Sequence, residues 1–384
     1  MLVFESDRSR PGTHALVVGV SRYPHLLGGD GATATNHYGL TQLRSAARSA
    51  NHFAEWLIHE ACLPVPLGSC RVMLAPSPEE AQTPEIQARS GGCTASDFLE
   101  EANDWIADAS RSPEESTVFY FVGQKLHSPG SEDLLLFEDF GAPRGPVFKG
   151  GVSFMNIFQG MGSNSSLSSQ VQHFFIDGSR HSLAESMGGF LRGTTDVFDV
   201  RPSQVDRRAG GTFHAAVPGG QAYAHVDGVS LFLETLLKGL RGGAAIQPSD
   251  GRGWAVTAGS LATWLRSESS AESDRFGVAL EYELSIRGEA TVCTLDKPPL
   301  VPVSITLDPP QAMMEASLRV VSDDGTSVHA ARFDGPSMDF DLPAGVYEFE
   351  IVPHWDWQRL RKLAVVSSPG LRQVFTVRPQ TAAP

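Results

Sequence analysis

Short runs of consecutive apolar residues, each followed by a turn rich in Gly, Pro, Ser or Asp, recur through the first two thirds of the chain. The five runs lie near residues 15–20, 70–75, 117–122, 171–177 and 211–217. Because the runs are continuous rather than alternating, they are typical of strands buried on both faces of a parallel sheet. We therefore predict a sheet of five mainly parallel strands.

Stretches in which apolar residues recur at helical spacing separate these runs. One stripe extends from Leu43 to Ile58. Thr94 and Asp97 predict a capping box before a second helix, and Ser230 predicts the cap of a third helix, LFLETLLKGL; LATWLRS predicts a shorter one. This alternation predicts helices on both faces of the sheet, with any functional site at the carboxyl ends of the strands.

The pattern changes after about residue 276. The segment FGVALEYELSIRG alternates apolar with mostly polar residues, and the linker TLDKPPLVP follows it. Short alternating runs divided by Gly, Pro and Asp then continue to the end of the sequence, with no helical stripe. We predict a first domain over residues 1–290 and a small all-β sandwich over residues 296–384.

The charge and cysteine content narrows the classes of partner. The 384 residues include 30 basic and 44 acidic side chains, a formal net charge of −14, which argues against nucleic acid or an anionic membrane as the main partner. Four scattered cysteines form no metal-binding motif, so we expect reduced thiols, a cytoplasmic protein and neither a metal nor another cofactor. No apolar run approaches the ~18 residues that span a bilayer.

Two of the predicted strands, in VFYFVGQK and HFFIDGSRHS, end in turns that carry polar residues. Together these stretches resemble the caspase-like cysteine peptidases, the superfamily of caspases and metacaspases. The family has Gly-His-Gly at the end of the first strand and Asp-x-Cys at the end of the second. Matched residue by residue, Gln124 takes the position of the catalytic histidine and Ser179 that of the catalytic cysteine. Their separation, 179 − 124 = 55 residues, is close to the roughly 50 expected between the two.

Further segments match the family in the same order. HALVVGVSRYP resembles its first strand and the loop that follows, LRSAARSANHFAEWL its first helix, and TFHAAVPGGQAYA its small-subunit strand and substrate loop. The resemblance covers roughly residues 13–270, is closest to bacterial caspase-like proteins, and stops before the C-terminal sandwich. It implies a fold of class α/β: a caspase-like three-layer sandwich with a mainly parallel sheet, followed here by a small all-β sandwich.

The residues at the catalytic positions depart from the family. A glutamine amide has no useful basicity, and a serine is a far weaker nucleophile than cysteine unless a base activates it. Gly123 and Lys125 occupy the turn that would supply the oxyanion hole, and Lys125 replaces a glycine of the family. His127, in the loop after Gln124, is the alternative base for Ser179; His181 and His173 are less well placed.

Asp177 lies where metacaspase-like enzymes place the acid that accepts a basic side chain of the substrate. The resemblance thus favours an inactive pseudopeptidase that binds a protein or peptide, regulating or scaffolding it, for example an active relative. Two alternatives stay open: a peptidase with a Cys or Ser nucleophile at position 179 that prefers basic residues, and a structural component of a larger bacterial assembly. The sequence does not indicate the oligomeric state.

Overall fold

The computed structural model describes residues 1–7, 9–128, 132–143, 145–162, 169–183, 194–198, 208–248, 253–313, 316–353 and 357–379. The chain divides into two compact units, which are described separately. Unit 1 comprises Met1–Leu237 and Thr257–Cys293, and unit 2 comprises Lys238–Val256 and Thr294–Pro384. The sequence pattern had not indicated that residues 238–256 belong with the C-terminal unit.

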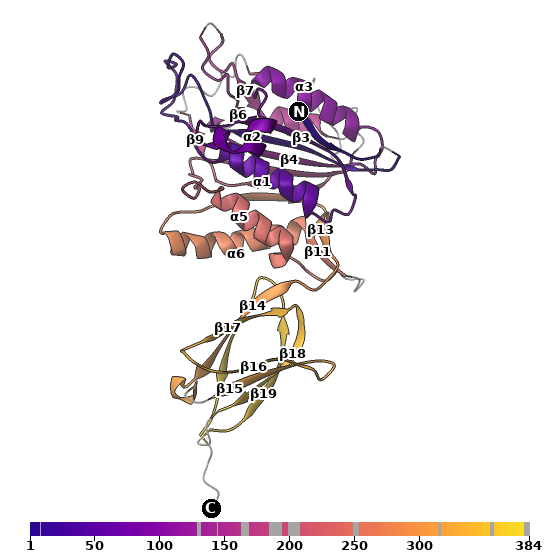
Figure 1. Cartoon of the computed structure of the whole chain (residues 1–384), viewed down its shortest axis with the longest axis vertical. Helices are drawn as coiled ribbons and strands as arrows, with labels where there is room; N and C mark the ends of the chain where they lie inside the picture. Colours follow the sequence, from indigo (N-terminus) through magenta and orange to yellow (C-terminus); the bar gives the residue numbers. More distant parts are fainter. Residues whose placement is uncertain are drawn as a thin grey trace, which may run out of the picture. The chain divides into compact units, whose positions relative to one another are not determined.

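A seven-stranded sheet in the order β1-β3-β2-β4-β8-β10-β12 forms the centre of unit 1 (Figure 1). Its strands are β1 (Leu2–Glu5), β2 (Thr13–Val20), β3 (Leu67–Ala75), β4 (Ser116–Val122), β8 (Val171–Asp177), β10 (Ala209–His214) and β12 (Glu283–Arg287). The five strands from β3 to β10 are parallel, as their continuous apolar runs predict, whereas the edge strands β1 and β12 are antiparallel.

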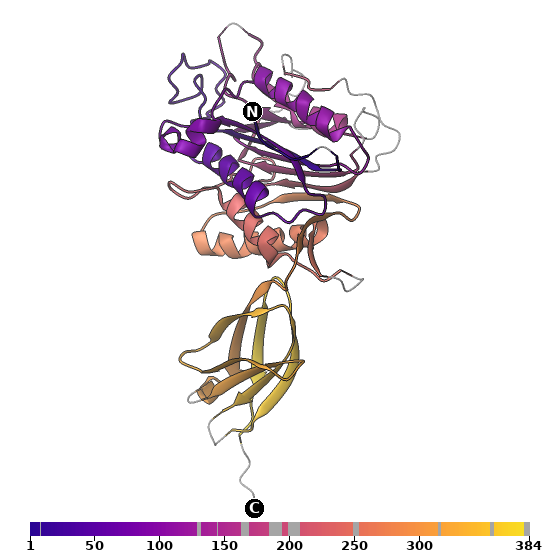
Figure 2. The ribbon, with the colours of Figure 1, turned by 45° about the vertical axis from the view of Figure 1, so that its right-hand side comes forward.

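Helices cover both faces of this sheet, which gives unit 1 three layers (Figures 1 and 2). On one face, α3 (Ala95–Ala109) and α4 (Phe154–Gly160) pack on aromatic side chains of β4 and β8. Phe98 of α3 lies edge-on to Phe119 of β4, and Phe154 of α4 lies edge-on to Phe174 of β8. On the other face lie α1 (Ala46–His59), α5 (Leu231–Lys238) and α6 (Ala258–Phe276). There Phe53 of α1 stacks on Tyr120 at 4.4 Å between ring centroids. The predicted fold class is confirmed.

A second, four-stranded sheet in the order β7-β6-β5-β9 lies at the carboxyl ends of the central strands. Its strands are β5 (Lys125–Ser128), β6 (Glu132–Leu136), β7 (Gly151–Ser153) and β9 (Arg180–Ser182). Because β5 follows β4 directly and β9 follows β8, this sheet continues the two turns that the sequence singled out. The sequence pattern did not predict it, since its strands are only three to five residues long.

The helix caps agree with the sequence, but several boundaries do not. The capping box of Thr94 and Asp97 at the start of α3 is confirmed, and so is Ser230 as a cap of α5, because its hydroxyl accepts the N–H of Leu233 at 3.0 Å. The run LATWLRS is part of α6, which has 19 residues and is longer than predicted. Shorter elements of unit 1 are η1 (Glu80–Gln82) and α2 (Pro84–Arg89).

Unit 2 contains a β-sandwich with its own apolar core. One sheet has the order β17-β14-β20 and the other β16-β15-β18-β19. The strands are β14 (Leu300–Asp308), β15 (Ser317–Ser322), β16 (Ser327–Arg332), β17 (Met338–Pro343), β18 (Gly345–Val352), β19 (Leu360–Val366) and β20 (Leu371–Thr376). The elements η3 (Gly239–Gly243) and η4 (Pro310–Met313) also lie in unit 2, while β11 (Trp254–Thr257) and β13 (Thr291–Leu295) span the points where the chain passes between the units.

No helix among the described residues is long and apolar enough to cross a membrane.

A buried polar network anchors the amino ends of β2 and β4. Glu115, which is 3% exposed, accepts the backbone N–H of Gly12 at 2.6 Å and lies 3.0 Å from Nε2 of His14. Nδ1 of His14 lies 2.8 Å from the hydroxyl of Ser69, and burial is the main cause that lowers the pKa of this histidine. Glu115 therefore satisfies two groups that have no access to water.

We predict that Glu115→Ala destabilises unit 1, because it leaves the Gly12 N–H and Nε2 of His14 without their carboxylate partner. The expected loss in the free energy of unfolding is about 1–3 kcal/mol for each buried group left unsatisfied. Urea unfolding followed by circular dichroism measures it. The matched control is Glu114→Ala: this neighbouring carboxylate is exposed, so its removal should change stability by less than about 0.5 kcal/mol. Equal effects of the two substitutions would contradict the role of the network.

Candidate functional site

The backbone of β4 and that of β8 meet closely where both strands end. Val122 and Asp177 are register partners, and the chains continue through Gly123 and Gly178. The N–H of Gly123 donates to the carbonyl oxygen of Asp177 at 3.3 Å. Gly178 has φ = 126°, and a Cβ there would collide with the carbonyl oxygen of Gly123. Glycine is therefore required at position 178, and it brings positions 124 and 179 to adjacent strand ends.

Gln124 is buried and is held by the loop between β2 and α1. Its backbone N–H donates to the hydroxyl of Tyr23 at 2.8 Å, and its side-chain Nε2 donates to the carbonyl oxygen of Thr41 at 2.9 Å. The Tyr23 hydroxyl in turn donates to the carbonyl oxygen of Leu136 at 3.1 Å. The amide of Gln124 thus acts as a structural donor to backbone.

Ser179 is partly buried, and its hydroxyl oxygen accepts the backbone N–H of Ala222 at 2.9 Å. No histidine among the described residues hydrogen-bonds to this hydroxyl. His127, the alternative base, is directed elsewhere: its Nδ1 lies 2.8 Å from Oδ1 of Asp133. Burial lowers the pKa of His181, and it lowers that of His173 to about 4.

Lys125 points away from this site, into the interior. Its side chain is fully buried, and Nζ donates to the carbonyl oxygen of Ile176 at 3.3 Å. Burial lowers the pKa of Lys125 to about 8, with Asp133 acting in the opposite direction. Lys125 is not among the residues with positive φ, so the backbone there has a conformation that any L-residue adopts.

A cluster of charged and titratable residues surrounds this lysine, on β5, β6, β9, β10 and β12. Asp133 is 5% exposed, pairs with His127, and lies 3.0 Å from Nε of Arg180, which also pairs with Glu283. His214 lies 3.6 Å from the same carboxylate, and burial lowers its pKa well below the ordinary value. Sequence reasoning missed this cluster, although it had singled out Lys125.

Asp177 is buried at the end of β8, and its two oxygens differ in their environment. The hydroxyls of Tyr120 and Ser230 both donate to Oδ2, the first at 2.9 Å. Oδ1 is also buried but has no hydrogen-bond partner among the described residues. Burial is the largest cause that raises the pKa of this carboxyl group; the two hydroxyls, Lys125 and the N–H of Gly178 oppose it.

These residues line one pocket of about 350 Å³. Its walls are formed by segments 42–46, 122–124, 177–179 and 222–227, together with Ser230. Gly123, Gln124, Asp177 and Ser179 thus lie at a common pocket, whereas Lys125 does not line it. His225 also lines the pocket, but its Nε2 lies 2.6 Å from Oε2 of Glu234. The pocket thus offers an acceptor, Asp177, and no histidine among the described residues is in hydrogen-bond contact with the hydroxyl of Ser179.

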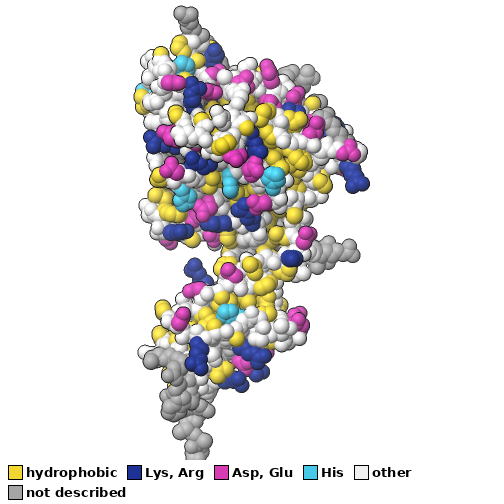
Figure 3. Space-filling model, viewed as in Figure 1, with side chains coloured by type: hydrophobic (Ala, Val, Ile, Leu, Met, Phe, Trp, Pro, Cys, Tyr) yellow, Lys and Arg dark blue, Asp and Glu magenta, His cyan; other side chains and the backbone are white. Residues whose placement is uncertain are grey.

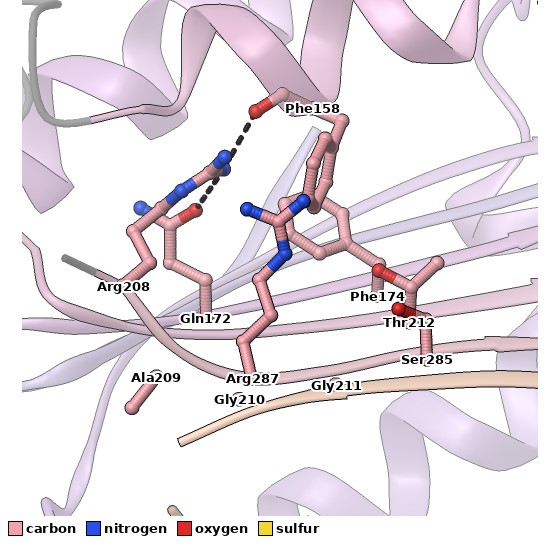
Figure 4. A pocket seen from close by; sticks show the side chains of 10 residues that line it. All are labelled: Phe158, Gln172, Phe174, Arg208, Ala209, Gly210, Gly211, Thr212, Ser285 and Arg287. Carbon is pink, nitrogen blue, oxygen red and sulfur yellow. Dashed lines mark hydrogen bonds between the residues drawn. The ribbon is translucent and has the colours of Figure 1, made fainter. Parts of the chain in front are cut away.

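A second pocket lies at the opposite ends of the strands, around Phe158 (Figure 4). The guanidinium carbons of Arg208 and Arg287 lie 4.3 and 4.7 Å from the centroid of its ring. Arg208 also donates to the Phe158 carbonyl oxygen at 2.6 Å and to Gln172 at 3.1 Å (Figure 4). Only about 10 Å³ of space is left, about enough for one water molecule, so these side chains largely fill the pocket themselves.

Within the described residues, no group of three or more His, Cys, Asp or Glu side chains is placed to hold a metal ion.

The pKa of Lys125 predicts how the stability of unit 1 depends on pH. The ordinary pKa of the lysine is 10.5 and the folded value is about 8, so between these pH values the unfolded chain binds more protons than the folded chain. The contribution of this site to stability therefore rises with pH across that interval. Relative to Lys125→Met, the wild type should gain up to about 3 kcal/mol in urea unfolding between pH 7.5 and 10. The exposed Lys149→Met should show no such trend, and parallel profiles for the wild type and Lys125→Met would contradict the assignment.

No protein-family model matches the sequence, and no curated protein does. Among solved structures, the chain is similar to protein GSU0716 from Geobacter sulfurreducens, with 9% identity and a TM-score of 0.39; the match covers 74% of this chain and 95% of that chain. It is also similar to caspase-1 from Spodoptera frugiperda, with 10% identity and a TM-score of 0.39, over 74% of this chain and 94% of that chain. Structures to which this chain is similar thus include a caspase.

Proposed function

We propose that this chain is a caspase-like pseudopeptidase, which binds a basic side chain of a protein or peptide in the 350 Å³ pocket and does not cleave it. The observation that carries the proposal is the contrast within this pocket. Gln124 and Ser179 are both engaged with backbone groups, while Oδ1 of Asp177 is a buried acceptor without a hydrogen-bond partner. Binding serves to regulate or scaffold the partner, for which an active relative is one candidate.

The absence of catalysis follows from proton chemistry. Acyl transfer by a serine needs a base that takes the hydroxyl proton and donors that stabilise the oxyanion. The Gln124 amide is not basic, and the Gly123 N–H already donates to the carbonyl oxygen of Asp177. Loss of a positioned base alone lowers rates by typically 10²–10⁴-fold, and residues that act as a unit fail together.

The charge and the size of the pocket favour a basic side chain as its ligand. Arginine and lysine form charge-assisted hydrogen bonds with carboxylates, and a ligand of this kind would satisfy Oδ1 of Asp177. Asp227 adds a second carboxylate to the lining, which also contains one arginine, Arg44, so the acidic side chains are in excess. The volume lies near the lower end of the roughly 300–1,000 Å³ of small-molecule pockets, which suits one side chain.

We predict that the purified full chain leaves fluorogenic Arg, Lys and Asp peptide substrates uncleaved. An active-site-directed electrophile should likewise fail to label Ser179, because no base activates its hydroxyl. Mass spectrometry of the treated protein checks labelling, and Ser179→Ala is the control for both measurements. Cleavage that Ser179→Ala abolishes would establish the alternative, a serine peptidase, and refute the pseudopeptidase.

We predict that an Arg-containing peptide binds the wild type and that Asp177→Asn weakens this binding by roughly 10- to 100-fold, the loss of one charge-assisted hydrogen bond. The asparagine keeps an oxygen that can accept from Tyr120 and Ser230, so the fold is retained. Isothermal titration calorimetry measures the affinity. Asp274→Asn, an exposed change of the same kind on α6, is the matched control.

The pH dependence of this binding gives a second readout. Burial raises the pKa of Asp177 above its ordinary 3.8, and only the ionised carboxylate attracts a cation. Affinity should therefore fall as the pH falls through the raised pKa, and Asp177→Asn should remove this dependence. The binding hypothesis fails if neither Arg nor Lys peptides bind, or if Asp177→Asn binds them as tightly as the wild type does.

A further inference from the structure

The β-sandwich of unit 2 has two outward faces of opposite charge. On each strand, residues that point into the core alternate with residues that point to solvent, so the register of the strands defines what each face carries. We call the outward surface of β16-β15-β18-β19 the basic face and that of β17-β14-β20 the acidic face. Their residues follow from the strand pairing.

The basic face concentrates arginines around one carboxylate. Glu350 on β18 points outward but is only 4% exposed, because arginines cover it. Arg361 donates to it at 2.8 and 2.9 Å, Arg359 lies at 3.1 Å and Arg319 at 4.0 Å. The three arginine side chains nevertheless remain 58%, 59% and 53% exposed. With Arg332 and Glu348, the face has four arginines and two glutamates, a surplus of two positive charges.

Exposed apolar side chains adjoin these arginines. Val346 and Val365 are directly opposite each other on β18 and β19, and Leu363 lies beside them. Their exposed fractions are 50%, 62% and 70%. In the view of Figure 3, Lys and Arg side chains gather over the part of the sandwich where Figure 1 labels β15 and β19. A surface that combines exposed apolar residues with unbalanced charge is typical of an interaction site.

The acidic face has the complementary composition. Asp339 and Asp341 on β17 are exposed and point outward, opposite Ser304 and Pro302, and Asp308 ends β14 on the same side. Arg372 on β20 is the cation of this face, which leaves a surplus of two negative charges. Val374 and Leu300, at 58% and 67% exposure, supply apolar surface here as well.

We infer that the basic face of one molecule binds the acidic face of a second copy of this chain. The surplus charges of the two faces are opposite in sign and equal in size, and both faces carry exposed apolar side chains that contact would remove from water. Because the contact joins different surfaces of the two copies, it is heterologous, and the dimer still has one free face of each sign, one on each copy. Association therefore continues beyond a dimer unless the rotation closes a ring.

Analytical ultracentrifugation of the full chain tests this inference. The average mass should exceed the 41.3 kDa of the monomer and rise with protein concentration at about 0.05 M salt. At about 0.5 M salt it should decrease, because the contact between the faces is largely electrostatic. A monomer at every concentration in low salt would overturn the inference.

Charge-reversal variants identify the surfaces. Arg319→Glu with Arg332→Glu reverses the basic face and leaves Arg359 and Arg361 on Glu350, and Asp339→Lys with Asp341→Lys reverses the acidic face. Each double variant alone should associate at least about tenfold more weakly than the wild type, since like charges then meet. A mixture of the two variants should associate again, because one then has two acidic faces and the other two basic faces.

Matched controls separate this contact from the effect of total charge. Lys297→Glu with Arg266→Glu, and Asp274→Lys with Asp296→Lys, make the same charge changes at exposed positions outside both faces, and they should associate as the wild type does. Thermal unfolding confirms that each variant is folded. If the face variants associate like their controls, or if the mixture stays monomeric, these two faces do not bind each other.

Discussion

The contact between Gly123 and Gly178 is the constraint on which the candidate site depends. Two parallel strands normally keep their backbones about 4.7–4.9 Å apart, with side chains above and below. At the ends of β4 and β8 the chains instead turn in the same place, and the positive φ of Gly178 lets its backbone lie against the carbonyl of Gly123. Any side chain at position 178 would push the two turns apart. Residues 124, 177 and 179 then could no longer line one pocket.

Around this contact, two side chains of the candidate site hydrogen-bond to backbone groups of the neighbouring loops. The Gln124 side chain fixes the loop at Thr41, and the Ser179 hydroxyl fixes the loop at Ala222. Both loops contribute residues to the lining of the pocket, 42–46 and 222–227. The side chains of Gln124 and Ser179 therefore hold the pocket in shape. In this arrangement the pocket is preorganised, so binding a ligand requires little ordering of its walls.

The sequence indicated those parts of the fold that are determined by continuous apolar runs. Strands buried on both faces are recognised easily, because consecutive residues along them are apolar. Examples are β4 with Phe119 and Phe121, and β8 with Phe174 and Ile176. The small sheet of β5, β6, β7 and β9 escaped notice because three to five residues do not establish a period. The edge strand β12 was recognised as a strand by its alternation, but nothing in that pattern states which sheet it joins.

The candidate site likewise has a part that the sequence predicted and a part that it did not. The family resemblance and the 55-residue spacing sufficed to propose Gln124 and Ser179 together, because the order of strands fixes where their ends lie. The partners of these residues were not predictable. Thr41 and Ala222 contribute backbone atoms, which any residue could supply, and the pairing of Asp133 with Arg180 joins positions 47 residues apart. The burial of Lys125 depends on the sheet that the sequence did not reveal.

Lys125 also constrains how this chain can change by mutation. A glycine at this position would leave an empty space where a large side chain is now fully buried, and it would remove a positive charge from beside Asp133. Replacing the lysine with glycine would thus lower stability before it could bring any advantage. Under the proposed function, a change toward peptidase activity would have to begin with this loss. The lysine would then act as an evolutionary ratchet, which leaves changes in what the pocket binds easier than a gain of peptidase activity.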